Sequence, residues 1–86
     1  GTAEVEERVV KEELKKSIQE LLEQLTPQEK KIIIMRFGLD RNEPKTLREI
    51  GEKLGISRER VRQLENRAKK KMREYALRKK LNVFLN

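Results

Sequence analysis

Arg58, Glu59, Arg62 and Gln63 are the residues of this sequence whose side chains are best suited to chemistry. On the edges of base pairs, arginine can hydrogen-bond to guanine, glutamine to adenine, and a carboxylate to the amino group of cytosine. Glu59 would repel phosphates, so its place among arginines favours a surface that discriminates between bases. The alternative is that Glu59 only complements the positive N-terminal end of a helix.

Positive charge is concentrated around and after this group. The 86-residue chain has a net charge of +7, and residues 57–86 alone hold 11 basic and 3 acidic side chains. This distribution is typical of a surface that binds a polyanion, although a merely solvated basic tail fits it equally well. The distal basic residues either contact phosphates or a protein partner, or are simply solvated: Arg67, Lys69, Lys70, Lys71 and Arg73.

An amphipathic helix is predicted to carry the base-reading group. Ser57 can cap this helix, and the face that presents Glu59 and Gln63 lies opposite an apolar stripe. The stripe repeats at about 100° per residue and consists of Val61, Leu64, Ala68, Met72 and Tyr75. Because Leu77 falls on the outward face, we expect the helix to bend or end near Tyr75.

A shorter helix precedes the reading helix, with a turn at Gly55 between them. Thr46 and Glu49 fit a capping box at its start, and Gly55 supplies the left-handed residue that the turn requires. Gly51 would let the two helices approach closely, which explains a glycine that costs roughly 1 kcal/mol in mid-helix. The expected shared core is Ile50, Leu54, Ile56, Val61 and Leu64. The pattern predicts a helix-turn-helix, with an ordinary helical hairpin as the alternative.

Two further helices are predicted upstream. Residues 1–25 have apolar residues at helical spacing, and we expect one long helix that packs on the domain rather than a coiled-coil seam. Thr26 and Glu29 then open a second helix with a capping box, and Gly38 ends it. The apolar run within residues 32–37 would by itself also fit a strand.

Together these elements predict an all-α fold, a small helical bundle of four to five helices that contains a helix-turn-helix. We expect residues 1–25 to form the N-terminal helix and residues 26–76 to form the DNA-binding domain. Residues 77–86 are a short C-terminal helix or tail, whose apolar positions are Leu81, Phe84 and Leu85. We expect the isolated domain to be a monomer.

The composition argues against several classes of function. Without histidine or cysteine the sequence offers no nucleophile–base pair and no usual set of metal ligands, so we expect no enzyme, metal or cofactor. Aromatic residues make up only 3%, too few for the stacking surfaces of single-strand RNA readers. No apolar run is long enough for a membrane span, and the lack of cysteine fits a reducing cytoplasm.

The segments "LTPQEKKIIIMRFGLD" and "TLREIGEKLGISRERVRQLENRAKKKMR" resemble region 4, the C-terminal domain of the sigma-70 family of bacterial RNA polymerase sigma factors. The resemblance covers residues 25–73 and is most specific in "RFGLD" and "SRERVRQLE". It implies a module of a bacterial cytoplasmic protein. That module recognises the −35 promoter element as duplex DNA while it is bound to RNA polymerase during transcription initiation.

The resemblance also implies roles for individual residues in DNA binding. The positions that match base contacts are Arg58, Glu59 and Gln63, and the chemistry above adds Arg62 to them. The positions that match contacts with the phosphate backbone are Arg36, Leu47, Ser57, Arg60, Arg62 and Arg67. We add Arg48, although housekeeping members usually carry an acid at that position.

Protein partners follow from the same resemblance. The positions that match contacts with transcription activators are Arg62, Arg67 and Lys70. Phe37 and Met72, with part of the first helix, are candidates for contact with the flexible flap of the polymerase β subunit. The tail lacks the His-Pro-Ser-type segment of housekeeping members, so both a primary and an alternative sigma factor fit. The competing hypothesis is a helical interaction module whose basic helix binds polymerase, an activator or an anti-sigma factor rather than DNA.

Overall fold

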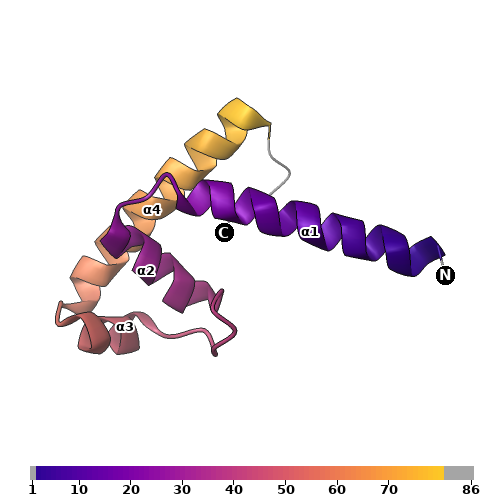
Figure 1. Cartoon of the computed structure of the whole chain (residues 1–86). Helices are drawn as coiled ribbons and strands as arrows, with labels where there is room; N and C mark the ends of the chain where they lie inside the picture. Colours follow the sequence, from indigo (N-terminus) through magenta and orange to yellow (C-terminus); the bar gives the residue numbers. More distant parts are fainter. Residues whose placement is uncertain (1, 81–86) are drawn as a thin grey trace.

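The computed structural model describes residues 2–80, and it describes side chains from residue 9 onward. Four helices make up this part of the chain: α1 (Thr2–Leu22), α2 (Pro27–Phe37), α3 (Leu47–Leu54) and α4 (Arg58–Lys79). These residues contain no strand, which confirms the predicted all-α class. The other three helices all contact α4, which is the centre of the fold (Figure 1).

The surroundings of α1 change along its length. Its last turns bury Leu21 and Leu22 in a cluster with α2 and α4, and Ile18 is partly buried beside them. Val10 and Leu14 are exposed, and α1 extends away from the other helices toward its N-terminus (Figure 1). Among the described side chains, the predicted packing on the domain is therefore confined to the end of α1. No helix in the described range is long and apolar enough to cross a membrane.

Capping groups fix both ends of α2, as predicted. The Thr26 hydroxyl accepts a hydrogen bond from the Glu29 main-chain N–H at 3.2 Å, and the Glu29 carboxylate accepts one from the Thr26 N–H at 2.9 Å. Gly38 ends the helix in the left-handed conformation. Ile32 is buried in a cluster with α3, whereas Ile33 is buried in a cluster with α1. This burial on two sides accounts for the continuous apolar run that would also fit a strand.

The helices α3 and α4 form the predicted helix-turn-helix. A capping box at Thr46 begins α3, and Ser57 caps α4. Gly55 turns the chain between the helices with a φ of 70°, a main-chain conformation that residues other than glycine rarely adopt. A Cβ on Gly51 would lie 2.7 Å from the carbonyl oxygen of Ile56. The close approach that requires a glycine is therefore made by the main chain of the turn.

Two hydrophobic clusters share α4. The cluster that joins α2, α3 and α4 contains Ile32, Ile50, Val61 and Leu64, with Leu54 and Ile56 partly buried against it. The cluster that joins α1, α2 and α4 contains Leu21, Leu22, Ile33, Ala68, Met72 and Ala76. All five predicted core positions of the helix-turn-helix therefore belong to the first cluster. Together the clusters fix the rotation of α4 about its own axis.

The helix α4 continues to Lys79, so the predicted alternative of an end near Tyr75 is wrong. Ala76 extends the buried face by a further turn, because it joins the cluster with α1. Leu77 lies on the outward face as expected and is 79% exposed, but leucine is a strong helix former and does not interrupt α4. The separate C-terminal helix or tail is predicted for residues 77–86. Residues 77–79 instead continue α4, and residues 81–86 lie outside the described part of the chain.

Candidate nucleic-acid interface

The first two turns of α4 present the predicted base-reading group. Val61 and Leu64 are buried against α3. With α4 rotated about its axis in this way, all four residues of the group are exposed on the opposite face. Residues three or four positions apart lie next to one another on a helix surface, so Glu59, Arg62 and Gln63 form a continuous patch. A helix held by one face against the preceding short helix has its other face free to enter a groove.

Hydrogen bonds connect the side chains of this patch. The Arg62 guanidinium donates to both carboxylate oxygens of Glu59, with a distance of 2.9 Å between Nε and Oε2. The Gln63 amide donates to Glu59 Oε1 at 3.5 Å, and Gln63 Oε1 accepts from Arg60 Nη1 at 3.4 Å. The two-pronged bond from Arg62 is the shortest of these contacts, so Arg62 is the main support of the Glu59 carboxylate.

The same contacts set the charge of Glu59. The hydrogen bond from Arg62 lowers the pKa of Glu59 below its ordinary value of 4.5, and the positive charges of Arg62 and Arg58 act in the same direction. The pair correspondingly raises the pKa of Arg62. At neutral pH Glu59 is therefore an anion that only accepts hydrogen bonds. This is the state in which a carboxylate can accept from the amino group of cytosine.

Most of the predicted phosphate contacts supply suitable donors. Leu47 is the first residue of α3, so its main-chain N–H has no partner within the helix, while its side chain is partly buried. The Ser57 hydroxyl accepts from the Arg60 main-chain N–H at 3.0 Å, which leaves its own hydrogen available to donate. Arg48, Arg60 and Arg67 are exposed. These groups lie at the start of α3 and along α4, where a duplex on the reading patch would place phosphates.

Arg36 differs from the other predicted phosphate contacts because its guanidinium is bonded within the protein, although its side chain is 37% exposed. Its Nε donates to Glu65 Oε2 at 2.8 Å, and its Nη1 donates to the Lys45 carbonyl at 3.1 Å. Glu65 is only 6% exposed, so Arg36 joins α2 and the loop before α3 to the inner side of α4. Glu65 is absent from the predicted residues. Glu65 lies between Leu64 and Ala68 on the core face, and an acid at such a position indicates an ion pair inside the protein.

Two of the distal lysines are also engaged within the protein. Lys71 Nζ lies 2.8 Å from Glu29 Oε1, and Glu29 is 1% exposed. Lys69 Nζ lies 3.4 Å from Glu65 Oε1 and 5.6 Å from the centre of the Phe37 ring. Both lysines are partners in ion pairs within the protein, so a contact with a phosphate or a partner would compete with these pairs. The remaining distal basic residues are exposed: Arg67, Lys70 and Arg73.

The two predicted contacts with the polymerase flap differ in accessibility. Phe37 lies at the end of α2 and is 37% exposed, so its ring can contact a partner. Met72 is 2% exposed because it lies in the cluster with Leu21 and Leu22 of α1. With α1 in this position Met72 is a core residue. The predicted contact of Met72 with the flap would therefore require α1 to move away from it.

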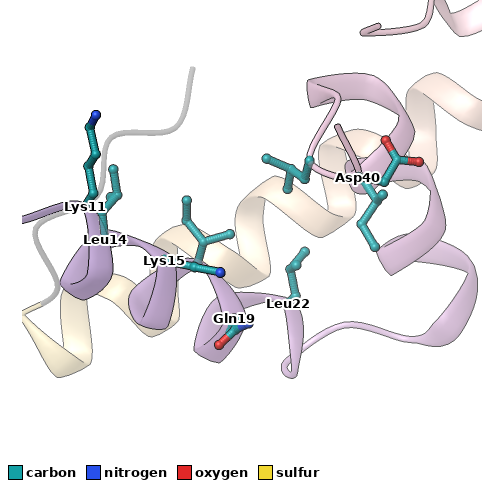
Figure 2. Close-up of a pocket in the computed structure, with 9 residues that line it drawn as sticks. Lys11, Leu14, Lys15, Gln19, Leu22 and Asp40 are labelled. Carbon is teal, nitrogen blue, oxygen red and sulfur yellow. The ribbon is translucent and has the colours of Figure 1, made fainter. Parts of the chain in front are cut away.

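An apolar groove lies on a different surface, between α1 and the end of α2 (Figure 2). It has a volume of about 380 Å³, and its apolar walls are formed by Leu14, Ile18, Leu22, Ile34 and Leu39. Lys11, Lys15, Gln19 and Asp40 complete its lining. Aliphatic walls of this kind suit an apolar side chain of a partner better than a phosphate group.

The fold and the patch together define a class of protein, the helix-turn-helix domain with polar and basic side chains on its second helix. Within the described residues, no three His, Cys, Asp or Glu side chains are grouped closely enough to hold a metal ion. The exposed side chains on the first two turns of α4 form a surface suited to binding.

Comparison with known proteins gives the family. The family model for sigma-70, region 4 matches residues 21–74. The chain is 48% identical over 69 residues to the RNA polymerase sigma-C factor of Nostoc sp. and 42% identical over 73 residues to the RNA polymerase sigma factor SigA of Clostridium acetobutylicum. It is 45% identical over 67 residues to the RNA polymerase sigma factor RpoD of Neisseria gonorrhoeae. The chain belongs to the sigma-70 region 4 family.

The extent of these matches is informative. They cover 80%, 85% and 78% of this chain, but only 17%, 19% and 10% of the three relatives. The family match begins at Leu21, so it includes the buried end of α1 and leaves out most of that helix. Membership of this family confirms the prediction that the domain is not an enzyme.

Proposed function

We propose that this chain is the promoter-recognition module of a bacterial sigma factor. It binds the −35 promoter element as duplex DNA and is tethered to RNA polymerase during transcription initiation. The observation that carries the proposal is the exposed patch on the first two turns of α4, where Arg58, Glu59, Arg62 and Gln63 project away from the core. Membership of the sigma-70 region 4 family supports it.

Base reading follows from the chemistry of this patch. The first turns of α4 enter the major groove, where Arg58 pairs with a guanine, Gln63 with an adenine, and the Glu59 carboxylate accepts from a cytosine amino group. The lowered pKa of Glu59 supports this role, because a protonated acid would lose part of its capacity to accept. Each good base contact of this kind contributes about 1–3 kcal/mol of discrimination.

Phosphate contacts hold the domain on the duplex and contribute affinity without base preference. The donors are the main-chain N–H of Leu47, the Ser57 hydroxyl, and the guanidinium groups of Arg48, Arg60 and Arg67. Arg36 contributes less than these, because two of its nitrogens are already bonded to Glu65 and Lys45.

Protein contacts complete the proposed function. Phe37, an exposed aromatic residue at the end of α2, contacts the flap of the polymerase β subunit. The exposed Arg67 and Lys70, with Arg62, form a basic surface for acidic residues of transcription activators. The polymerase then holds the domain near the promoter, which raises the effective concentration of a weakly binding module.

Selection from a pool of randomised DNA duplexes tests the proposal directly. We expect the wild-type chain to enrich one short sequence. Glu59→Ala should lose preference at one base pair of that sequence, by about 1–3 kcal/mol. The matched control is Glu74→Ala, which removes an exposed acid further along α4 and should keep every preference. Equal recovery of all sequences by the wild-type chain at low salt would overturn the proposal.

A protein-interaction module is the second candidate function. The observation that favours it is the apolar groove between α1 and α2, whose wall includes the exposed Leu39. Titration of the labelled chain with a β-flap fragment and, separately, with a duplex distinguishes the two functions. Binding of the flap fragment that depends on Phe37, together with no binding of any duplex, would favour the second candidate over the first.

A further inference from the structure

The carboxylate of Glu65 is bonded through both of its oxygens on the inner side of α4. Oε2 accepts a hydrogen bond from Arg36 Nε at 2.8 Å, and Oε1 lies 3.4 Å from Lys69 Nζ. The side chain is only 7% exposed, so it is out of reach of a duplex on the reading patch. Because each oxygen has its own cation, the carboxylate is fixed in one orientation. It therefore also fixes the nitrogen of Arg36 to which it is bonded.

Arg36 extends from this carboxylate to the loop before α3. Its Nη1 donates to the Lys45 carbonyl at 3.1 Å, and the Lys45 N–H donates to the Met35 carbonyl at 2.9 Å, which joins the loop to α2. Leu47, two residues after Lys45, is the first residue of α3 and a proposed phosphate donor through its main-chain N–H. The guanidinium of Arg36 is therefore held close to the main chain that meets a phosphate in the proposed complex.

The guanidinium of Arg36 keeps donors for a further partner. It has five N–H groups, and the bonds to Glu65 and Lys45 use two of them. The side chain is 37% exposed, so part of it is open to a ligand. An exposed arginine loses rotamer freedom when it binds a ligand, whereas the bonds to Glu65 and Lys45 order Arg36 beforehand. The arrangement suits a phosphate oxygen, which accepts charge-assisted hydrogen bonds.

We infer that Glu65 is a positioning residue for DNA binding, which holds Arg36 so that its remaining N–H groups contact the phosphate beside the start of α3. This inference rests on the proposed function and adds to it a residue that does not touch the duplex. Glu65 acts on affinity and not on base preference, because a phosphate carries no sequence information. The contribution is smaller than that of an exposed arginine, since Glu65 balances the charge of Arg36.

A purely structural role of Glu65 has to be distinguished from positioning, because its bond to Arg36 also joins α2 to α4. The ion pair of Glu29 with Lys71 joins the same two helices at 2.8 Å, and Glu29 is likewise buried. Neither residue of this second pair is among the proposed phosphate donors. Glu29→Gln is therefore the matched control for Glu65→Gln. Each substitution removes one buried negative charge and leaves an amide oxygen that can still accept a hydrogen bond.

The experiment measures the affinity of five chains for duplex DNA at one low salt concentration. They are wild type, Glu65→Gln, Arg36→Ala, the double variant Arg36→Ala/Glu65→Gln, and Glu29→Gln. We expect Arg36→Ala and Glu65→Gln each to weaken binding roughly threefold, equally for the selected duplex and for unrelated duplexes. The direction is informative, because loss of an acid would otherwise strengthen binding to a polyanion. In the Arg36→Ala chain, Glu65→Gln should cause no further weakening, and Glu29→Gln should bind as the wild-type chain does.

Three results would overturn the inference. Unchanged or tighter binding by Glu65→Gln would mean that Glu65 does not hold Arg36 for a phosphate. Further weakening by Glu65→Gln in the Arg36→Ala chain would mean that the loss does not act through Arg36. Equal weakening by Glu29→Gln would mean that the loss comes from the packing of α2 on α4.

Circular dichroism shows whether each variant is folded, and Arg36→Lys supplies the test if Glu65→Gln is not. Lysine keeps the charge, but it cannot bond to Glu65, the Lys45 carbonyl and a phosphate from one rigid plane. We therefore expect Arg36→Lys to bind as weakly as Arg36→Ala. Wild-type affinity of Arg36→Lys would show that charge alone suffices at this position, which overturns the inference.

A measurement without DNA separates this inference from the proposed function. In NMR spectra of the wild-type chain, the Hε of Arg36 should exchange with water more slowly than the Hε of Arg67, because Arg36 Nε is bonded to a buried carboxylate and Arg67 is exposed. Equal exchange rates would mean that the pair does not form in solution, which overturns the inference alone. A wild-type chain that binds no duplex at low salt would instead overturn the proposed function, and the inference with it.

Discussion

The first two turns of α4 and the rest of that helix are both rich in arginine and lysine, but their surroundings differ. At the start of the helix, Glu59 and Arg62 pair with each other at the surface. Further along, Lys69 and Lys71 pair with acids that are almost fully buried. The inner face also changes, because α3 covers it at the start and α1 covers it around Met72.

This difference separates two uses of charge in one helix. Ion pairs on the inner side join α4 to α2, so they fix how the helix is rotated and which residues face outward. The outward charged side chains at the start of α4 do not join it to another helix, so they are available to bind a ligand. The count of basic residues therefore overstates the surface available to an anion, since two of the lysines compensate buried carboxylates.

The largest effect should come from the covered part of α4. Met72→Ala removes a side chain that is 2% exposed, and we expect the free energy of unfolding to fall by about 3 kcal/mol in urea denaturation. Leu77→Ala is the control on the same helix, and should change it by less than about 0.5 kcal/mol because Leu77 lies in solvent. A small effect of Met72→Ala would mean that α1 leaves Met72 uncovered in solution.

Neighbouring lysines test the internal ion pair. Lys71→Ala leaves the buried Glu29 carboxylate without its charged partner, and should lower the free energy of unfolding by about 2 kcal/mol. Lys70→Ala removes the same charge from an exposed position and should lower it by less than about 0.5 kcal/mol. Chemical denaturation of the two variants at the same salt concentration makes the comparison. Equal effects would contradict the assignment of Lys71 as a structural residue.

Two amides test where the reading surface ends. Gln63→Ala should lower the preference at one base pair by about 1.5 kcal/mol, because Gln63 belongs to the patch at the start of α4. Asn66→Ala, three residues further along on an exposed position, should leave all preferences unchanged. Competition binding with single-base variants of the selected duplex measures both. A loss of preference in Asn66→Ala would extend the reading surface into the second part of the helix.

Acid should weaken the internal pair between Glu29 and Lys71. Burial alone would raise the pKa of Glu29, but the hydrogen bonds from Lys71 and Thr26 outweigh it and lower the pKa below 4.5. A lowered pKa in the folded state stabilises the protein above pH 4.5, and this contribution is lost as the pH falls through the folded value. We expect denaturation curves to be independent of Glu29 protonation from pH 7 to about 5. Below about pH 4.5, Glu29→Gln should lose less stability than the wild-type chain.

The sequence predicted best what depends on neighbouring residues. The capping boxes at Thr26 and Thr46 and the turn at Gly55 are set by residues within a few positions of one another, and the structure confirms all three. The outward direction of Glu59 and Gln63 followed from helical spacing alone, because one apolar stripe fixes the opposite face.

Contacts between distant parts of the chain were not predictable in this way. Arg36 and Glu65 are 29 positions apart, and Glu29 and Lys71 are 42 positions apart, so no local pattern connects them. The burial of Met72 depends on where α1 crosses α4, and helical spacing gives the apolar face of a helix without naming its partner. An acid on the core face, as at Glu65, was the available sign of such a contact.

The smallest effect should separate outward charge from internal charge. Arg67→Ala removes an exposed guanidinium, so it should weaken binding to every duplex by a similar small factor and lower the salt slope by about 0.9. Lys69→Met keeps the apolar stem beside Phe37 but removes a charge that Glu65 already compensates, so the slope should stay the same. Titrations at several salt concentrations measure both slopes. Equal slopes for the two variants would mean that the ion pairs in the second part of α4 open in the complex. The lysines of this part would then also contact DNA phosphates.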